Sequence, residues 1–581
     1  MIRILINGKP VHAREDATIL EASYEDKYAS KQFDILIPSL QYLKGIQQED
    51  LSGLSVVEVN GMEGLVNAST VTVTEGMEIS TKTPAVIEAQ KAALAKILAK
   101  HDLDCKNCLR TGNCELQVLQ RRFRMTKDPA TAKIKTLPID DSGIIVRDGN
   151  KCVACGRCVE VCGKVQGIAA ITTVGEGDDK TVTSMNGPFA TGMGLGASKC
   201  VNCGQCIAVC PVGALYEKDN TADVCAALAD PDKFVVVQAA PSIRSSVGEY
   251  FQYPIGSKTE GKLAAALRAL GFDRVFDTTF GADLTVMEEA HEFIDRVKNG
   301  GVLPMTTSCC PGWVQYCEQE FPELLAHVSS CKSPHQMEGA IIKSYLAEKE
   351  GIAKEKIVVV SVMPCTAKKF EVARPEMAGD VDYAITTREL CRMIEKAGIK
   401  FPSLADEKFD SPLGVGSGAA VIFGATGGVM EAALRTAADW MAGEALNDIV
   451  YTDVRGIDGV KEATVSIAGK DVKVAIVSGL ANARSLMNKV AASETDYSMI
   501  EVMACPGGCV NGGGQPQQLA ATRIVNDLRT QRADALYGLD EGAEIRKAHD
   551  NPEIKALYSA YLGEPGSEKA HGLLHTTYVI R

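Results

Sequence analysis

Two cysteine runs in the first half of the chain have the spacing of iron–sulfur ligands. The first run reads C-x2-C-x2-C-x3-C, and the second repeats this spacing and is followed by Pro211. In the bacterial ferredoxin pattern, three cysteines of one run and the fourth of the other hold each 4Fe–4S cluster. Two zinc sites are the alternative, but zinc sites usually draw two closely spaced cysteines from each arm. The predicted ligand sets are Cys152, Cys155, Cys158 and Cys210 for one cluster, and Cys162, Cys200, Cys203 and Cys206 for the other.

A third group of potential ligands lies upstream, with the spacing His101-x3-Cys105-x2-Cys108-x5-Cys114. Three cysteines leave a 4Fe–4S cubane one ligand short. His101 is the nearby candidate for the fourth position. On spacing alone, His101 is equally well explained as an ordinary surface or core residue.

The C-terminal half carries three separate motifs that contain cysteine. TSCCPGW holds Cys309 and Cys310, MPCTAKK holds Cys365, and ACPGGCVNGGGQP holds Cys505 and Cys509. One interpretation is buried structural cysteine, which is common for free thiols. However, glycines around the last motif allow close approach of the backbone to a bulky inorganic group. Four of these cysteines could hold another cubane, which would leave the fifth as a free thiol.

The elements that must position these ligands follow from the hydrophobic pattern. Residues 219–530 alternate apolar strands (FVVVQA, KIVVVSVM, VKVAIVSG) with amphipathic helices, which is typical of an α/β fold with buried, largely parallel strands. Residues 1–82 show short alternating strands (IRILING, LSVVEV, STVTV) around a helix near Leu20 to Tyr28, which predicts a small β-grasp domain. The fold class is therefore multidomain α/β and α+β. The predicted domains are 1–82, the β-grasp domain; 83–135, the His101 cluster domain; 140–218, the two-cluster ferredoxin domain; and 219–581, a large α/β domain with a C-terminal tail wrapped around it.

Composition and charge exclude several classes of protein. The net charge of −13 argues against a general nucleic-acid binder, which is normally basic. Apolar runs such as the one near Val358 fall well short of the roughly 20 residues that a membrane-spanning helix needs, so no membrane association is expected. The N-terminus MIRILINGKP lacks the pattern of a secretory signal, which predicts a cytoplasmic protein. In such a chain, 20 cysteines favour metal ligation over disulfides.

The chain resembles the FeFe-hydrogenases over nearly its whole length. The resemblance rests on the three C-terminal motifs in their order along the chain, together with the ferredoxin runs and the His101 segment. The resemblance implies an enzyme that reversibly reduces protons to dihydrogen with electrons from a ferredoxin- or flavodoxin-type carrier. It implies three accessory 4Fe–4S clusters, one of them ligated by His101. It also implies an H-cluster, which is a 4Fe–4S cubane bridged to a two-iron unit with carbon monoxide, cyanide and a dithiolate amine, supplied by maturation proteins. The implied cubane ligands are Cys310, Cys365, Cys505 and Cys509, with Cys509 as the bridge.

The resemblance also implies a route for protons. Cys309 is the free thiol beside the bridging amine, and a thiol with a reference pKa of about 8.5 exchanges protons near neutrality far better than a hydroxyl. The implied relay continues through Glu289, Ser329 and Glu292 towards Arg296. The helix spacing i, i+3, i+7 places Glu289, Glu292 and Arg296 on one face. Spacing alone would be more typical of a solvated helix side.

Four further residues are implied to surround the two-iron unit. Lys368 is expected to face one cyanide as a point positive charge, and Ser242 to lie near the other. Met363 and Met503 are expected to pack against the unit, although methionines at such positions are more often core filler.

The chain departs from the family pattern at several places. Many relatives open with a plant-type 2Fe–2S domain, but here Gln41, Ser52, Ser55 and Ser69 stand where its cysteines would be, so no 2Fe–2S cluster is expected. Electrons would then enter at the His101 cluster. Lys100 to Lys151 contains eleven Lys or Arg against seven Asp or Glu, and the QRRFRMTK stretch is either a docking site for an acidic ferredoxin or a solvated helix face.

Other departures concern individual side chains. His335 and Glu338 differ from the residues usual in relatives and could tune the polarity of the cofactor pocket. Cysteines without an assigned role are expected to serve packing, namely Cys225, Cys317, Cys331 and Cys391.

Two other functions fit parts of the sequence. One is the hydrogen-activating subunit of a multi-subunit hydrogenase that reduces NAD(P). In that case the nicotinamide site would be on a partner subunit, because this sequence has no convincing dinucleotide-binding glycine motif. The other is a non-catalytic iron–sulfur relative, either a hydrogen sensor or an assembly protein. A sensor would be expected to carry signalling segments, and an assembly protein would not need Cys309 and the glutamate relay.

Overall fold

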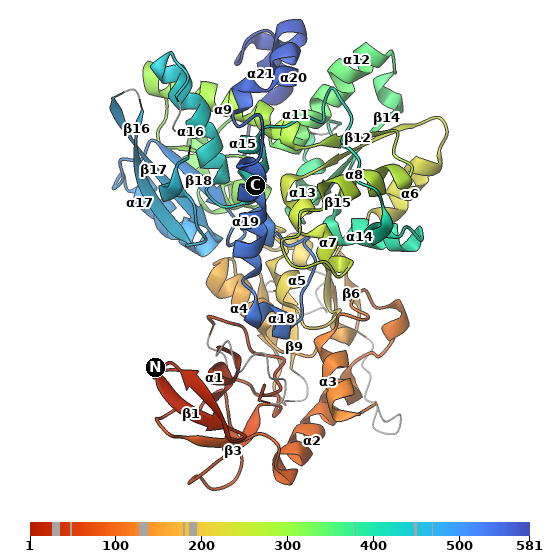
Figure 1. Ribbon diagram of the computed structural model, residues 1–581, viewed down its shortest axis with the longest axis vertical. Coiled ribbons are helices and arrows are strands. Elements are labelled where there is room, and N and C mark those ends of the chain that lie inside the picture. The colour runs from red at the N-terminus through yellow and green to blue at the C-terminus, as the bar shows by residue number, and fades with distance from the viewer. Residues whose placement is uncertain are drawn as a thin grey trace.

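The computed structural model describes residues 1–25, 35–46, 49–126, 137–177, 180–184, 194–377, 379–446, 450–467 and 469–581. A small N-terminal part with β1 and α2 lies at the bottom of Figure 1, and a large α/β part lies at the top. The segment with the two ferredoxin-type cysteine runs lies between them. The molecule is therefore multidomain, as the sequence predicts.

The N-terminal part is built on a five-stranded sheet with the order β2-β1-β5-β3-β4. β1 pairs parallel with β5, and its buried Ile4 and Ile6 pack with Ile19 and Leu20 of the helix α1. The predicted strand STVTV is absent, and only an isolated bridge joins Thr72 to Thr18. The predicted helix begins at the expected place, while its last residues, 26–28, lie outside the described residues. The elements are β1 Ile2–Ile6, β2 Lys9–Ala13, α1 Ile19–Glu25, β3 Val56–Val59, β4 Val66–Asn67 and β5 Glu78–Ser80.

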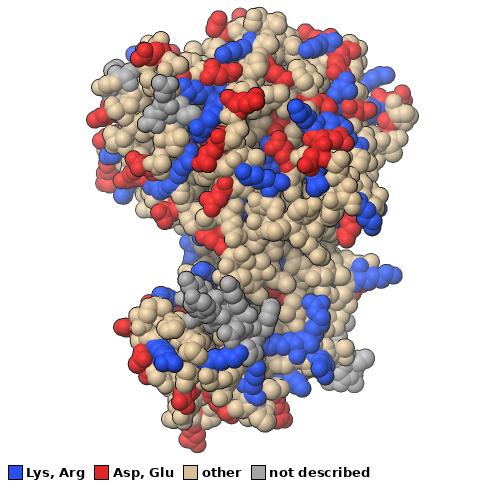
Figure 2. All heavy atoms as spheres, in the orientation of Figure 1, with Lys and Arg blue, Asp and Glu red and all other residues tan. Residues whose placement is uncertain are grey.

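Two helices follow, α2 (Pro84–Lys100) and α3 (Glu115–Phe123). The Thr83 hydroxyl accepts a hydrogen bond from the Val86 amide and caps α2, with Pro84 at the first helical position. α2 ends at Lys100 and His101 is its C-cap residue, so the potential ligands His101 to Cys114 lie between the two helices. Figure 2 shows Lys and Arg side chains gathered over the region of α3.

The segment with the two cysteine runs combines two small sheets and two short helices. The helices follow Gly156 and Gly204, whose φ angles of +78° and +70° suit glycine and turn the chain sharply inside each run. β10, β7 and β6 form an antiparallel sheet, and β8 and β9 form a second antiparallel pair. The elements are β6 Ile139–Asp140, β7 Ile145–Asp148, α4 Arg157–Glu160, β8 Ile171–Val174, β9 Thr181–Ser184, α5 Gln205–Val209 and β10 Leu215–Glu217.

The large part contains two four-stranded sheets, β12-β11-β14-β15 and β13-β18-β17-β16. All pairs in the first sheet are parallel, and in the second only β16 and β17 are antiparallel. The prediction of largely parallel, buried strands is confirmed. The strands are β11 Phe234–Ala239, β12 Arg274–Asp277, β13 Met305–Thr306, β14 Ile357–Met363, β15 Tyr383–Thr386, β16 Val460–Ile467, β17 Lys470–Ser478 and β18 Met499–Met503.

Helices surround these two sheets, and the longest, α9, carries the predicted glutamate relay. The buried face of α9 packs on α11 and α16. The helices are α6 Thr221–Ala229, α7 Val247–Tyr250, α8 Glu260–Ala269, α9 Thr279–Asn299, α10 Pro311–Glu320, α11 Pro334–Ile341, α12 Ala347–Glu350, α13 Ala367–Val372, α14 Thr387–Lys396, α15 Gly418–Val421, α16 Gly428–Ala442, α17 Leu480–Ala491, α18 Ala520–Val525, α19 Leu528–Asp540, α20 Pro552–Leu557 and α21 Glu568–Leu574.

The C-terminal tail packs against the large part. Leu557 and Leu574 share a buried cluster with Phe280 and Leu284 of α9. The backbone of the tail pairs with residues 330–332, where the Thr576 amide donates to the Ser330 carbonyl and the Lys332 amide to the Leu574 carbonyl. Among the described residues, no helix is long and apolar enough to cross a membrane.

Candidate active site

Loops at the carboxyl ends of the parallel strands bring the C-terminal cysteines together. Cys309 and Cys310 lie between β13 and α10, Cys365 lies between β14 and α13, and Cys505 and Cys509 follow β18. Ligands of open α/β sheets bind at this edge, because the loops that follow adjacent parallel strands meet there. The two sheets therefore place all five thiols around one point.

These five thiols line a single cavity of about 80 Å³. A cavity needs only about 10–15 Å³ of such volume to hold one water molecule, so this one is large enough for a bulkier group. Lys368, Met363, Met503 and Ser242 also line it, as the sequence predicts for residues near a two-iron unit. His335 lines the cavity too, whereas Glu338 is not among its lining residues.

The donor set of the cavity fits an iron–sulfur group. Soft thiolates are the ligands that such clusters use. Burial, and secondarily the charge of Cys365, raise the pKa values of Cys505 and Cys509 far above that of an ordinary thiol. Ligation would release these protons, because metals bind the deprotonated thiolate. Cys203 of the second ferredoxin-type run lines the same cavity, so a cluster held there would lie next to it.

A buried ionic cluster fixes the lysine of the cavity. The Lys368 ammonium donates to Glu371 Oε2 at 2.8 Å and to the Cys309 carbonyl at 3.1 Å. His335 contacts the same Glu371 oxygen through Nε2, and its Nδ1 lies 3.0 Å from the Ser361 hydroxyl. Burial and the Lys368 charge lower the pKa of His335 to about 4, so its ring is neutral at pH 7. Glu371 thus anchors the one positive charge of this cluster. The sequence analysis did not identify this role, although the i, i+3 spacing of Lys368 and Glu371 on α13 was an available signal.

The predicted proton relay is only partly joined by hydrogen bonds. Ser329 donates to Glu292 Oε2 at 2.8 Å, and Arg296 binds the other oxygen of Glu292 at 2.6 Å. Glu289 is completely buried, and neither of its oxygens makes a hydrogen bond of good geometry among the described residues. Burial and the charge of Glu292 raise the pKa of Glu289 to about 8. Burial, followed by the charge of Glu289, raises the pKa of the Cys309 thiol well above its ordinary value.

The predicted ligands of the accessory clusters also gather in space. His101, Cys105, Cys108 and Cys114 line one small cavity, and Cys152, Cys155, Cys158 and Cys210 line another. Burial, followed by the charges of Cys203, Cys200 and Cys162, raises the pKa of Cys206 well above its ordinary value. These residues lie together in the groups that the sequence analysis named, and their ligation of clusters stays a prediction.

Comparison with known proteins identifies the family. Residues 233–513 match the iron only hydrogenase large subunit, C-terminal domain, and residues 526–581 match the iron hydrogenase small subunit. The chain is 45% identical to the NADP-reducing hydrogenase subunit HndD of Solidesulfovibrio fructosivorans over 597 residues, which covers 100% of this chain and 99% of that one. It is 42% identical to iron hydrogenase 1 of Clostridium pasteurianum over 594 residues, with 100% of both chains covered. The chain belongs to the iron-only, or FeFe-, hydrogenases.

A solved structure supports the same assignment. The hydrogenase matches an apo FeFe-hydrogenase HydA1 from Chlamydomonas reinhardtii with a TM-score of 0.56 and 42% identity, over 62% of this chain and 99% of that chain. Residues 90–129 match the NADH-ubiquinone oxidoreductase-G iron-sulfur binding region, and residues 151–214 match the 4Fe-4S dicluster domain. The protein is therefore an oxidoreductase with a hydrogenase catalytic domain and ferredoxin-like iron–sulfur domains.

The comparison corrects one prediction about cofactors. Residues 1–84 of the hydrogenase match the 2Fe-2S iron-sulfur cluster binding domain, which contradicts the expectation that the chain has no 2Fe–2S cluster. That expectation considered only four side chains, whereas the match covers the segment as a whole. The hydroxyls of Ser52 and Ser55 donate to the Asp50 carboxylate, and the Asp50 amide donates to the Ser69 hydroxyl. Gln41 is buried near them, its amide bonded to Ser39, which also donates to Asp50.

Two further predictions about single residues require comment. Cys317, Cys331 and Cys391 are buried, as expected for packing, but Cys225 is exposed, so the prediction is wrong for Cys225. Gln515 was not predicted, although it reaches into the site: its side chain contacts Ser242 and the Cys509 carbonyl. The GGGQP phrase that contains Gln515 was the available signal.

Proposed function

We propose that this hydrogenase interconverts protons, electrons and dihydrogen at an H-cluster held in the cavity of Cys309. The observation that carries the proposal is the convergence of five thiols, from three loops, on one buried cavity that also contains Lys368. When bound, the H-cluster supplies the iron site at which protons and electrons are combined. Cys310, Cys365, Cys505 and Cys509 would hold its iron through their thiolates.

The remaining residues of the cavity orient and enclose that unit. Lys368, kept in place by Glu371, would offer a positive charge to an anionic ligand of that unit. Met363 and Met503, both almost completely buried, would exclude water from it, and Ser242 would offer a hydroxyl group from the cavity wall. Dedicated maturation proteins supply the two-iron unit.

Protons reach the cavity through Cys309. Because burial raises its pKa, the thiol keeps its proton at neutral pH and passes it on only as another is supplied. Glu289, with a pKa of about 8, can serve as either acid or base near neutrality, which suits a relay. Ser329, Glu292 and Arg296 continue the route outward through the hydrogen bonds that join them.

Electrons reach the cavity through the three accessory 4Fe–4S clusters. The proposed domains are 1–82, a β-grasp domain of the 2Fe–2S ferredoxin type; 83–135, with the cluster of His101; 140–218, with the two ferredoxin-type clusters; and 219–581, the catalytic domain with its C-terminal tail. The last accessory cluster would lie beside the cavity, since Cys203 lines it. A ferredoxin- or flavodoxin-type carrier supplies the electrons.

A relative favours a second candidate for the electron partner. The NADP-reducing hydrogenase subunit HndD aligns over its full length, so this chain could instead act as the hydrogen-activating subunit of a multi-subunit complex. The two candidates are separated by an assay of dihydrogen-driven ferredoxin reduction with the purified chain alone. Ferredoxin reduction at a rate near that with viologen supports the soluble carrier, and activity with viologen alone supports the subunit.

The activity is tested by measuring dihydrogen evolution from reduced methyl viologen with anaerobic protein that contains the complete H-cluster. We expect evolution by the parent chain and a loss of at least about 100-fold in Cys309→Ser, because positioned proton transfer contributes about 10²–10⁴-fold. Cys391→Ser, which alters a buried cysteine outside the cavity, is the matched control. Absence of evolution in cofactor-loaded parent protein would refute the assignment, and full activity in Cys309→Ser would refute the relay.

A further inference from the structure

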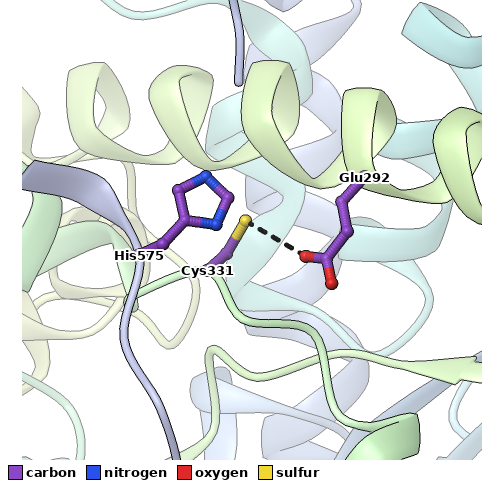
Figure 3. Close-up of side chains that lie close together, drawn as sticks. All are labelled: Glu292, Cys331 and His575. Atoms are coloured by element: carbon purple, nitrogen blue, oxygen red, sulfur yellow. Dashed lines mark hydrogen bonds between the residues drawn. The ribbon is translucent and has the colours of Figure 1, made fainter. Parts of the chain in front are cut away.

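We propose that Glu292, Cys331 and His575 form a binding site for Zn²⁺ that regulates proton transfer. One ligand atom from each residue lies within 4.8 Å of the others, and Figure 3 shows the three side chains converging from α9, the loop at residue 331 and the C-terminal tail. A thiol, an imidazole and a carboxylate are the three protein ligand types that zinc takes, and three such ligands leave a fourth position for water.

The separations suit a tetrahedral ion. Cys331 Sγ lies 3.8 Å from Glu292 Oε2. With Zn–S and Zn–O bonds of about 2.3 and 2.1 Å, two ligand atoms at the tetrahedral angle are about 3.6 Å apart. A small rotation of side chains is therefore enough to enclose the ion. Glu292 is partly exposed while Cys331 is completely buried, which gives the ion a way in from the Glu292 side.

The imidazole is already oriented as in zinc sites. His575 Nε2 lies 3.0 Å from Glu288 Oε2, and Nδ1 lies 2.8 Å from the Ser330 hydroxyl, which in turn contacts Glu292. Nδ1 is thus the nitrogen on the side of Glu292. Ligating histidines commonly donate their second nitrogen to a carboxylate, which fixes the tautomer and the ring orientation. Glu288 has this position, and the Gly566 amide and the Tyr558 hydroxyl hold it in place.

The charge around the site favours a cation. Glu288 is completely buried on α9, one turn from Glu292. The Arg296 guanidinium donates to Glu292 Oε1, which leaves Glu292 Oε2, the oxygen nearest Cys331, for the ion. Besides burial, the charges of Glu292, Glu289 and Glu288 raise the pKa of the Cys331 thiol. A bound divalent ion would offset this negative potential and displace the thiol proton.

Zinc at this site would interrupt the relay at a defined atom. Glu292 Oε2, the oxygen nearest Cys331, is also the acceptor of the Ser329 hydrogen bond at 2.8 Å. An ion on this oxygen removes the acceptor that Ser329 needs. This consequence rests on the proposed relay, whereas zinc binding itself does not.

Binding and inhibition are measured separately on the holoenzyme, with Cys225→Ser in every variant because Cys225 is an exposed thiol. One equivalent of ZnCl₂ is added anaerobically, and unbound metal is removed by desalting. The zinc retained per chain is measured by elemental analysis, and its ligands are identified by X-ray absorption at the zinc K-edge. We expect one zinc with a single sulfur neighbour at about 2.3 Å. Cys331→Ser should lose that sulfur signal, and Cys317→Ser, which changes another completely buried cysteine, should keep it.

Inhibition is followed as the zinc concentration that halves viologen-driven dihydrogen evolution, relative to each variant's own zinc-free rate. Cys331→Ser, His575→Gln and Glu288→Gln should each raise this concentration by at least about tenfold, which is the usual effect of removing a residue that orients a metal ligand. Equal zinc content and an unchanged sulfur signal in Cys331→Ser would refute the site, as would failure of the parent chain to retain zinc. Zinc bound with one sulfur but without inhibition would support the site and refute the Glu292 relay.

Discussion

Glu338 is a carboxyl group buried without a charged partner. Its side chain is completely buried on α11, and neither oxygen has a hydrogen bond of good geometry among the described residues. Burial, reinforced by the charge of Asp277, raises its pKa well above 4.5. The carboxyl group therefore keeps its proton to a higher pH in the folded protein than in the unfolded chain.

This titration predicts a pH-dependent loss of stability. A raised pKa in the folded state contributes stability that is fully present below pH 4.5 and is lost as the pH rises through the folded-state pKa. We expect Glu338→Met to raise the apparent melting temperature, and the gain over the parent chain to be larger at pH 8 than at pH 5. Calorimetry of the two proteins at both pH values measures this difference in apparent melting temperature.

Glu541→Gln is the control for this prediction, since Glu541 is exposed at the end of α19. Its melting temperature should follow that of the parent chain at both pH values. A gain in Glu338→Met that is independent of pH would show that the carboxyl is not the source of the effect.

Residues of the site differ in how far the sequence could predict them. Cluster ligands such as Cys152 and Cys155 are spaced closely along the chain, so their grouping can be read directly. Gln515 could not be identified in this way, because its partner Ser242 lies 273 positions away along the chain and is brought to it by packing. Glu371 lies only three positions from Lys368 on α13, but its second partner, His335, lies 36 positions away.

At the scale of elements, the loop after β18 depends on glycine. Gly508 has a φ of +90°, and a Cβ at this position would lie 2.6 Å from the Thr426 amide nitrogen. Both the conformation and the lack of space exclude a side chain here. The loop therefore brings Cys509 to the cavity only along a backbone path that glycine permits.

Gly508→Ala is expected to displace Cys509 and to lower both stability and cluster content. Gly508 has φ +90° and ψ −163°, a region that is essentially restricted to glycine and costs another residue about 1–3 kcal/mol, and the clash with backbone adds to this. Iron content per chain and the apparent melting temperature measure the effect. Gly443→Ala is the matched control, because Gly443 has a φ of +73° with no atom within 4 Å of its Cβ position, so only the conformational cost should be seen. Similar iron contents in the two variants would contradict the expectation.

The strands were predictable where they are long and apolar, as in β11 and β14. β13 has only two residues, Met305–Thr306, too few for any pattern, yet it carries the loop with Cys309. Its place is set by parallel pairing with β18, in which Met305 lies opposite Met499. For STVTV, the sequence predicted a strand that the structure does not have. The segment has the alternating pattern of a strand, but only one isolated bridge joins it to a neighbouring segment.

At the scale of the whole molecule, the described parts are fastened to one another by buried contacts. Glu115 of α3 is paired with Arg157 of the ferredoxin-type segment and with Arg523 of α18. The Thr366 hydroxyl, next to Cys365, donates to the Asn202 carbonyl, next to Cys203. These contacts fix the accessory cysteines relative to the cavity, as a chain of electron carriers requires.

Charge is distributed unevenly over this assembly. The protein is acidic overall, with a net charge of −13, yet Lys and Arg gather over α3. Arg121 and Arg124 are exposed there, whereas Arg122 is partly engaged with the Leu36 carbonyl. Lys127 of the predicted docking stretch lies outside the described residues. An acidic carrier approaching the molecule would be attracted mainly to this basic surface, close to the His101 group.

Complementary charge chiefly speeds encounter, so the effect of this surface should depend on salt. At an ionic strength of about 0.1 M the Debye length is about 10 Å. Doubling this ionic strength should slow turnover with ferredoxin and leave turnover with methyl viologen, a small carrier that needs no docking surface, unchanged. Arg121→Glu with Arg124→Glu should slow ferredoxin turnover severalfold and remove most of its salt dependence. Lys396→Glu with Lys489→Glu makes the same change in net charge at exposed sites of the catalytic part and should have little effect. Equal slowing of ferredoxin and viologen by salt, or equal effects of the two double variants, would show that α3 is not where the carrier docks.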